Sequence, residues 1–153
     1  MALSISVFQK QAGSDKQGMQ KTLDEVRKLF KKDRFATESG AVIDEIGERY
    51  AKCSMKLSDS HRNALGAVMG GAIFTLADFA FAVAANWQDP GVVSLSSNIA
   101  YLGTAKGEKL TAWAQCIKNG RTTSYYNIDI ADELGNQVAV MTVTGYRKPI
   151  AGH

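Results

Sequence analysis

The sequence is poor in cysteine and histidine. Its 153 residues include two cysteines, Cys53 and Cys116, and two histidines, His61 and His153. The cysteines do not have the paired spacing of a metal site, so they are expected to be free thiols in a reducing compartment. Two histidines do not make a convincing metal site either. We therefore expect no metal centre.

A large excess of charge of one sign is also absent. The formal net charge is +3, from 18 basic and 15 acidic residues. This charge helps to attract an anionic ligand but is far from the concentrated basic stripe of a nucleic-acid binder. The first residues have neither the apolar core nor the basic flank of a signal peptide. We therefore expect a cytoplasmic protein with no nucleic-acid partner.

Internal repeats, low-complexity tracts and interdomain linkers are absent as well. The length fits one domain with a sizeable core, and the hydrophobic content of 45% is ordinary for a globular protein. Residues 1–18 mix polar residues with glycines and are predicted to form a loosely held arm. Residues 19–153 are predicted to form the single domain.

A long apolar segment, from His61 to Asn86, contains one acid, Asp78. Its length and its Gly66-x-x-x-Gly70 spacing raise the possibility of a membrane span. Glycines near its start and Asp78 near its centre oppose exposure to lipid, so the pattern favours a helix from about Gly70 to about Asn86 in a protein core. An unpaired carboxylate is costly to bury, which makes Asp78 a candidate functional residue.

The remaining pattern predicts one short helix and a sheet. Thr22 and Glu25 have the spacing of a capping box, and apolar residues then recur at helical spacing to about Lys32. The long helix is broken at Asp89-Pro90-Gly91. Strands are predicted over 42–46, 50–57, 92–102, 109–118, 122–130 and 137–147, the last four as a meander with a tight hairpin at Asn119-Gly120. A single sheet wrapped around the long helix explains why this helix is apolar nearly all round.

Several motifs point to one family. Asn63-x-x-Gly66-x-x-x-Gly70-Gly71, followed by Ala-Ile-x-Thr-Leu-Ala-Asp78, resembles the hot-dog acyl-CoA thioesterases of the phenylacetate-pathway (PaaI-like) type. The likeness continues through 91–102, through Lys118-Asn-Gly-Arg121-Thr and into the last strand, and covers roughly residues 35–148. It implies an α+β hot-dog fold, an antiparallel sheet wrapped around one long central helix, here with a short extra N-terminal helix.

The resemblance also implies an activity and an assembly. The substrate is an acyl-CoA, which is hydrolysed to the free acid and CoA without a metal or other cofactor. The protein is expected to form a homodimer or a dimer of dimers, with active sites between subunits. In each site the helix acid of one subunit faces the start of the helix of its partner.

Four residues receive catalytic roles from the resemblance. Asp78 acts as a general base on water or attacks the thioester directly, and the backbone N–H of Gly70 holds the thioester oxygen. Asn63 orients the substrate or the water, and Ser94 supports Asp78 or the water. Physical chemistry agrees with the first two roles. A helix N-terminus offers free N–H groups and a partial positive charge, and apolar surroundings make a carboxylate a better base.

Weaker expectations concern substrate contacts. Glycine at 70 and 71 lets an acyl group approach the backbone closely. The acyl group is expected in an apolar slot along the helix, near Phe74, Ala77 and Phe81. Arg121 is the first candidate for an ion pair with the phosphates of coenzyme A, although charges on exposed strand ends are common in any sheet.

One position departs from the family pattern, because Met69 stands where the family has a histidine before Gly70-Gly71. A methionine side chain neither donates a hydrogen bond nor carries charge. The alternative function is therefore a non-catalytic acyl-CoA-binding hot-dog protein. A hot-dog dehydratase or hydratase ranks lower because it needs a histidine base, and a purely structural dimer leaves Asp78 unexplained.

Overall fold

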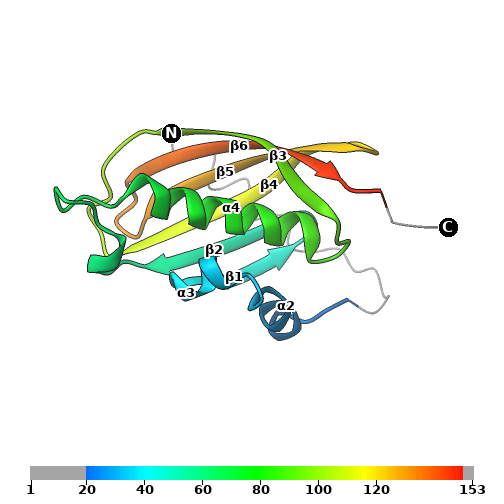
Figure 1. The fold of residues 1–153 in the computed structure, drawn as a ribbon, viewed down its shortest axis with the longest axis horizontal. Helices are drawn as coiled ribbons and strands as arrows, with labels where there is room; N and C mark the ends of the chain where they lie inside the picture. The colour runs from blue at the N-terminus through cyan, green and yellow to red at the C-terminus, as the bar shows by residue number, and fades with distance from the viewer. Residues whose placement is uncertain (1–19, 150–153) are drawn as a thin grey trace.

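A computed structural model describes residues 20–149, in which six strands form one antiparallel sheet (Figure 1). The strands are β1 (Ala41–Gly47), β2 (Tyr50–Lys56), β3 (Val92–Tyr101), β4 (Lys109–Asn119), β5 (Thr123–Asp132) and β6 (Gln137–Arg147). The strands predicted from the alternating pattern are therefore confirmed. The predicted arm, residues 1–18, lies outside the described residues.

The order of the strands differs from the predicted four-stranded meander. The sheet order is β1-β2-β4-β5-β6-β3, so of the four strands predicted as a meander only β4, β5 and β6 are neighbours in chain order. The other edge of β4 is occupied by β2, with Met55 opposite Leu110. Strand β3 therefore pairs with the free edge of β6 and becomes the edge of the sheet.

The long helix, α4 (Gly70–Asn86), lies along one face of the sheet (Figure 1). Leu76, Ala80 and Val83 are fully buried, and the small alanine side chain lets the helix backbone pack close to the strands. The predicted central helix is confirmed. No helix within residues 20–149 has the length and apolar character needed to span a membrane.

Asn86 ends α4 and starts β3. Its Nδ2 donates to the carbonyl oxygens of Ala82 and Val92, and its Oδ1 accepts from the N–H groups of Gly91 and Val92. Gly91 has φ 121°, a conformation that strongly favours glycine. The predicted break at 89–91 is confirmed, and β3 runs back along α4 in the opposite direction.

Two short helices lie at the β1 side of the sheet (Figure 1). Helix α2 (Leu23–Phe30) has the predicted capping box, in which the Thr22 hydroxyl accepts from the Glu25 N–H and the Glu25 carboxylate accepts from the Thr22 N–H. It ends at Phe30 rather than near Lys32. Helix α3 (Arg34–Glu38) was not predicted, because five residues are too few to show a helical period.

The hairpin predicted at Asn119-Gly120 is confirmed, because β4 and β5 pair antiparallel on either side of it. Its turn lies slightly later than predicted. Asn119 still pairs with Ser124, and the Gly120 N–H donates to the carbonyl oxygen of Thr123 at 2.8 Å, which leaves Arg121 and Thr122 as the turn residues. Gly120 accordingly does not adopt the positive φ of an Asn-Gly turn.

A buried carboxylate, that of Asp132 at the end of β5, holds two loops together. It accepts hydrogen bonds from the N–H groups of Lys106, Gly107, Leu134 and Asn136, and from the Asn136 side chain, at 2.8 to 3.1 Å. Burial opposes its ionisation, but the hydrogen bonds, led by that of the Asn136 amide, outweigh this effect. They lower the pKa of Asp132 to about 2.

Replacing this carboxylate is expected to destabilise the fold. Asp132→Ala leaves five donors without their acceptor, so the free energy of unfolding at neutral pH should fall by about 3 kcal/mol. Because the folded-state pKa is lowered, the stabilisation is present above the ordinary pKa and is lost as the pH falls towards about 2. Urea unfolding at several pH values should show the difference from wild type shrinking in acid. Asp59→Ala, at an exposed position, is the control. A difference that does not change with pH would contradict this account.

Candidate active site

A pocket of about 470 Å³ lies between α3 and α4, within the usual range for small-molecule sites. On the α4 side its lining residues recur at helical spacing and form one face of the helix. The residues that line it are Asp33, Arg34, Phe35, Ala36, Phe74, Thr75, Asp78, Phe79 and Ala82. The pocket therefore combines apolar walls with two carboxylates.

Asp78 is the acid that the sequence singled out, and it lies half-buried in this pocket. No hydrogen bond or ion pair within residues 20–149 engages its carboxylate. Burial, and then the negative charge of Asp33, raise its pKa above the ordinary value. Arg34, which also lines the pocket, forms its ion pair with Glu38, at 2.7 Å, rather than with Asp78. Such a carboxylate is suited to accept a proton.

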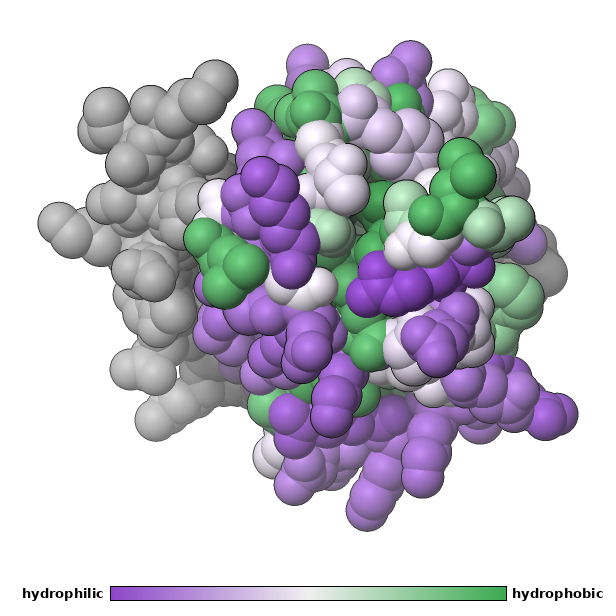
Figure 2. Space-filling model, turned by 90° about the vertical axis from the view of Figure 1, so that its left-hand side faces the viewer, coloured by the Kyte–Doolittle hydropathy of each residue, from purple (hydrophilic) through white to green (hydrophobic). Residues whose placement is uncertain are grey.

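The first turn of α4 carries backbone N–H groups that, within the described chain, are free to bind a ligand. Met69 is the N-cap residue, and its side chain makes no capping hydrogen bond. Its carbonyl oxygen accepts from the N–H groups of Ala72 and Ile73, whereas those of Gly70 and Gly71 have no partner among residues 20–149. Free N–H groups at a helix start attract negative charge. Figure 2 views the molecule from this end and shows apolar surface between polar side chains.

Tyr101 fixes this helix start to the end of β3. Its hydroxyl donates to the carbonyl oxygen of Gly70 at 3.0 Å, and its ring lies so close that a Cβ at Gly70 would stand 3.0 Å from it. At Gly71, by contrast, the nearest atom to an added Cβ would be the Met69 methyl at 3.8 Å. A side chain at position 70 would therefore push against Tyr101, whereas one at position 71 would not.

Asn63 lies in the exposed loop that leads to α4. Its Oδ1 accepts from the N–H groups of Leu65 and Ala67, and its own N–H donates to the Ala67 carbonyl oxygen. Gly66 completes the turn with φ 81°. His61, just before this loop, is buried, its Nδ1 accepts from the Ser58 N–H, and it has a structural role.

Within one chain, the four residues expected to be catalytic do not lie close together. Gly70 and Asp78 are eight residues apart, which separates them by about 12 Å along the helix axis. Ser94 is exposed near the beginning of β3, at the end of the strand that follows Asn86. Asn63 and Gly70 are at one end of α4, Asp78 is near its middle, and Ser94 is towards its other end.

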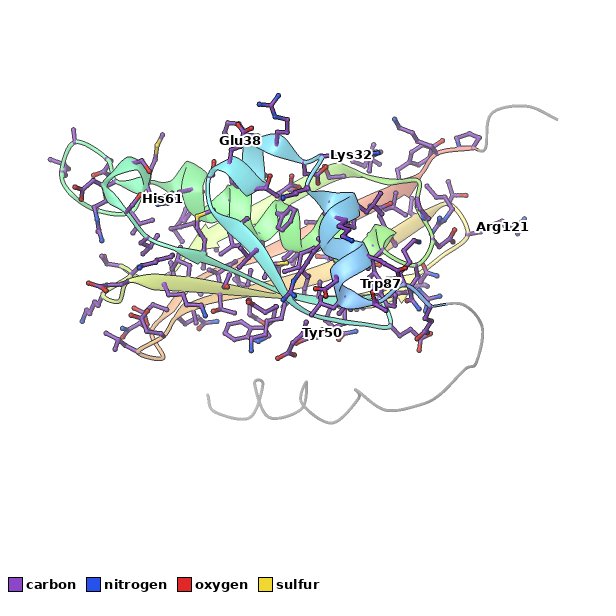
Figure 3. The ribbon with its side chains drawn as sticks, turned by 90° about the horizontal axis from the view of Figure 1, so that it is seen from below. Lys32, Glu38, Tyr50, His61, Trp87 and Arg121 are labelled. Atoms are coloured by element: carbon purple, nitrogen blue, oxygen red, sulfur yellow. The ribbon has the colours of Figure 1, made fainter. Side chains whose placement is uncertain are left out.

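Of the residues expected to contact substrate, some line the pocket and others lie away from it. Phe74 lines the pocket, but Ala77 is fully buried and Phe81 packs edge-on against Tyr126 in the core, with ring centroids 5.2 Å apart. Arg121 is exposed in the β4–β5 turn, at the opposite end of the molecule from His61 (Figure 3). Neither Phe81 nor Arg121 belongs to the pocket lining.

Helix α3 supplies pocket residues that sequence reasoning missed, among them Asp33 and Phe35. A weak signal was present in the sequence. An aspartate precedes a short run in which a phenylalanine and an alanine interrupt polar residues, as at the start of an amphipathic turn. The run was too short for a helical period to identify it.

Comparison with known proteins decides the family. The model of the thioesterase superfamily matches residues 65–139. The acyl-coenzyme A thioesterase PaaI of Escherichia coli is 31% identical over 120 residues, which cover 78% of this chain and 86% of that protein. The chain belongs to the PaaI-like thioesterases of this superfamily. It is therefore a hot-dog thioester hydrolase, as its motifs implied.

Solved structures of this family share the fold. The E. coli PaaI protein superposes with a TM-score of 0.76 at 28% identity, and the match covers 84% of this chain and 97% of that one. A hypothetical thioesterase of Streptococcus pneumoniae, solved with coenzyme A, has a TM-score of 0.73 at 26% identity and coverages of 80% and 99%.

The two glycines at the start of α4 should differ in their tolerance of a side chain. Gly70→Ala displaces the Tyr101 ring and its hydrogen bond to the helix start, and should lower the free energy of unfolding by about 1 kcal/mol. Gly71→Ala meets no close contact and should be neutral or stabilising, because alanine favours a helix by about 1 kcal/mol over glycine. Denaturant unfolding of the two variants measures both effects. Equal effects would show that Tyr101 does not constrain the helix start.

Proposed function

We propose that this protein hydrolyses an acyl-CoA thioester to the free acid and coenzyme A. One observation carries the proposal above the others. In a chain of the thioesterase superfamily, the single acid of the central helix lies in a pocket with apolar walls, and its carboxylate makes no ion pair within residues 20–149. The S. pneumoniae relative solved with coenzyme A supports this substrate class.

In the proposed reaction Asp78 either removes a proton from a water whose oxygen attacks the carbonyl carbon of the thioester, or attacks that carbon with its own carboxylate. The carbonyl oxygen becomes negatively charged, and the free N–H of Gly70 stabilises it. When the tetrahedral intermediate collapses, the carbon–sulfur bond breaks and coenzyme A leaves as a thiolate. In the base route the thiolate takes up the proton that Asp78 removed from water, and in the nucleophile route water hydrolyses the mixed anhydride left on Asp78 and supplies the proton. The amide Nδ2 of Asn63 and the hydroxyl of Ser94, which make no hydrogen bond within the described chain, would orient substrate or water.

These roles require two copies of the chain. Asp78 and Gly70 of one subunit are about 12 Å apart along the helix, too far to act on the same carbonyl group. We propose a homodimer in which two α4 helices lie antiparallel, so that Asp78 of each copy meets the helix start of its partner. Two such dimers would form the dimer of dimers that the resemblance also allows.

The edge strand β3 supports this assembly. It is ten residues long and carries no charged residue. Leu95 and Tyr101 on it are 65% and 52% exposed. Natural sheet edges are usually protected by charges, proline or a covering segment, and a long uncharged edge is a template for pairing with another chain. A second copy placed along β3 would bury these side chains.

The non-catalytic acyl-CoA-binding protein is the second candidate, and Met69 is the observation that favours it. The Met69 side chain is 57% exposed at the helix start and supplies no hydrogen bond there. The oxyanion donor proposed here is a backbone group, however, and does not depend on the side chain at position 69. Hydrolysis is therefore the better-supported function.

Asp78→Asn should abolish hydrolysis and leave binding intact. The amide cannot accept a proton from water or attack the thioester, so release of free thiol from a panel of short, medium, long and aromatic acyl-CoAs should fall about 100-fold or more. Asp59→Asn, at an exposed position outside the pocket, should keep wild-type activity. If the wild type releases no thiol but binds the same ligands saturably, the binding-protein function replaces the enzyme.

Breaking the β3 contact should remove activity together with the dimer. Leu95→Lys places a charge on the edge strand and should shift the mass in sedimentation from about twice 16.5 kDa to 16.5 kDa. Thiol release should fall in parallel. Leu134→Lys is the matched control, because Leu134 is also an exposed leucine, 66% exposed, in the β5–β6 turn. A Leu95→Lys monomer with full activity would exclude a site shared between subunits.

A further inference from the structure

We infer that Phe35 of α3 is a specificity-determining residue: it forms the outer wall of the acyl pocket and selects acyl-CoAs whose acyl group is long or bulky enough to reach it. This inference rests on the proposed function and goes further, because it assigns a substrate contact to a helix that the sequence pattern did not reveal.

The charges of the pocket lining indicate which half of the substrate it holds. Asp78 must lie next to the carbonyl carbon, so the acyl chain attached to that carbon begins at the pocket. The charged residues that line the pocket are Asp33, Arg34 and Asp78. Two of them are acids, and the cation among them, Arg34, is paired with Glu38, so the charge of this lining disfavours the polyanionic end of coenzyme A. An uncharged apolar acyl chain fits this lining.

Two aromatic rings of α4 form fixed walls of the pocket. Phe79 is 3% exposed and packs edge-on against Phe30 of α2, with ring centroids 6.2 Å apart at 87°. Phe74, one turn earlier on α4, is half-buried and packs against the hydrophobic core. Both rings are held by the core, so they form the floor of the pocket. Ala82, the next residue on this face, leaves space beside them.

Phe35 is held differently from these two rings. Its side chain is 78% exposed in the described structure, although it lines the pocket. An exposed phenylalanine gains little from folding, whereas contact with an acyl chain would remove its surface from water. Its helix, which ends at Glu38 (Figure 3), is held in place by contacts with β1 and α4. These contacts place the ring at the pocket without burying it.

The size dependence follows from this arrangement. An acetyl group at Asp78 ends close to the carbonyl carbon and touches α4 alone. A longer or bulkier acyl group extends across the pocket towards α3. Only the second kind of substrate gains binding free energy from the Phe35 ring.

Binding without turnover tests the inference. In the Asp78→Asn background, affinities for coenzyme A, acetyl-CoA and hexanoyl-CoA are measured by calorimetry. Adding Phe35→Ala should weaken hexanoyl-CoA binding about tenfold, since the ring contributes apolar contact, and should leave the affinities for coenzyme A and acetyl-CoA unchanged. Phe35→Leu should retain most of the affinity. Leu65→Ala, which removes another exposed apolar side chain outside the pocket, should change none of the three.

Equal weakening of all three ligands, or no weakening of any, would overturn the role of Phe35. Its role would also be overturned if hexanoyl-CoA bound no more tightly than coenzyme A before Phe35 was changed. These outcomes are separate from a failure of the proposed function, in which the wild type would release no thiol or would release it independently of Asp78. Because Phe35 is exposed, circular dichroism should be the same for Phe35→Ala and its parent.

Discussion

The packing of α4 against the sheet is the interaction on which the rest of the structure depends. One side of the helix, with Leu76, Ala80 and Val83, is fully buried on the strands. This apolar contact fixes the rotation of the helix about its axis. The rotation decides that Asp78 turns away from the core and into the pocket beside α3. A helix turned by half a revolution would bury this carboxylate without a partner.

The same packing also determines where the helix begins. The carbonyl oxygen of Gly70 is held by Tyr101, and the Met69 carbonyl oxygen uses the N–H groups of Ala72 and Ile73. Between these contacts the N–H groups of Gly70 and Gly71 remain free within the described chain. The start of α4 and the Asp78 carboxylate are separated along a rigid helix. The two groups of one subunit therefore cannot both act on the same thioester bond. The proposed dimer follows from this separation and from the uncharged edge of β3.

Much of the fold could be predicted from the sequence because its signals are local. The capping box of Thr22 and Glu25, the strand alternation and the apolar run that ends at Asn86 each depend on neighbours in the chain. The predictions that failed depended on remote contacts. The place of β3 beside β6 was decided by β2, which occupies the other edge of β4. The β4–β5 hairpin was predicted, but the position of its turn, after Gly120, was decided by the register of the two strands.

The candidate site also has features that the sequence predicts and features that depend on remote contacts. The sequence by itself determined that an acid stands in an apolar helix that begins with two glycines, since these features need only the chemistry of each residue and a helical period. It also indicated the family. Only the tertiary structure decided which residues surround Asp78. In the structure Phe81 packs in the core against Tyr126, and Phe35, from a five-residue helix, lines the pocket. The physical reason is that a side chain's surroundings depend on which elements pack against its helix, and that packing joins residues distant in the chain.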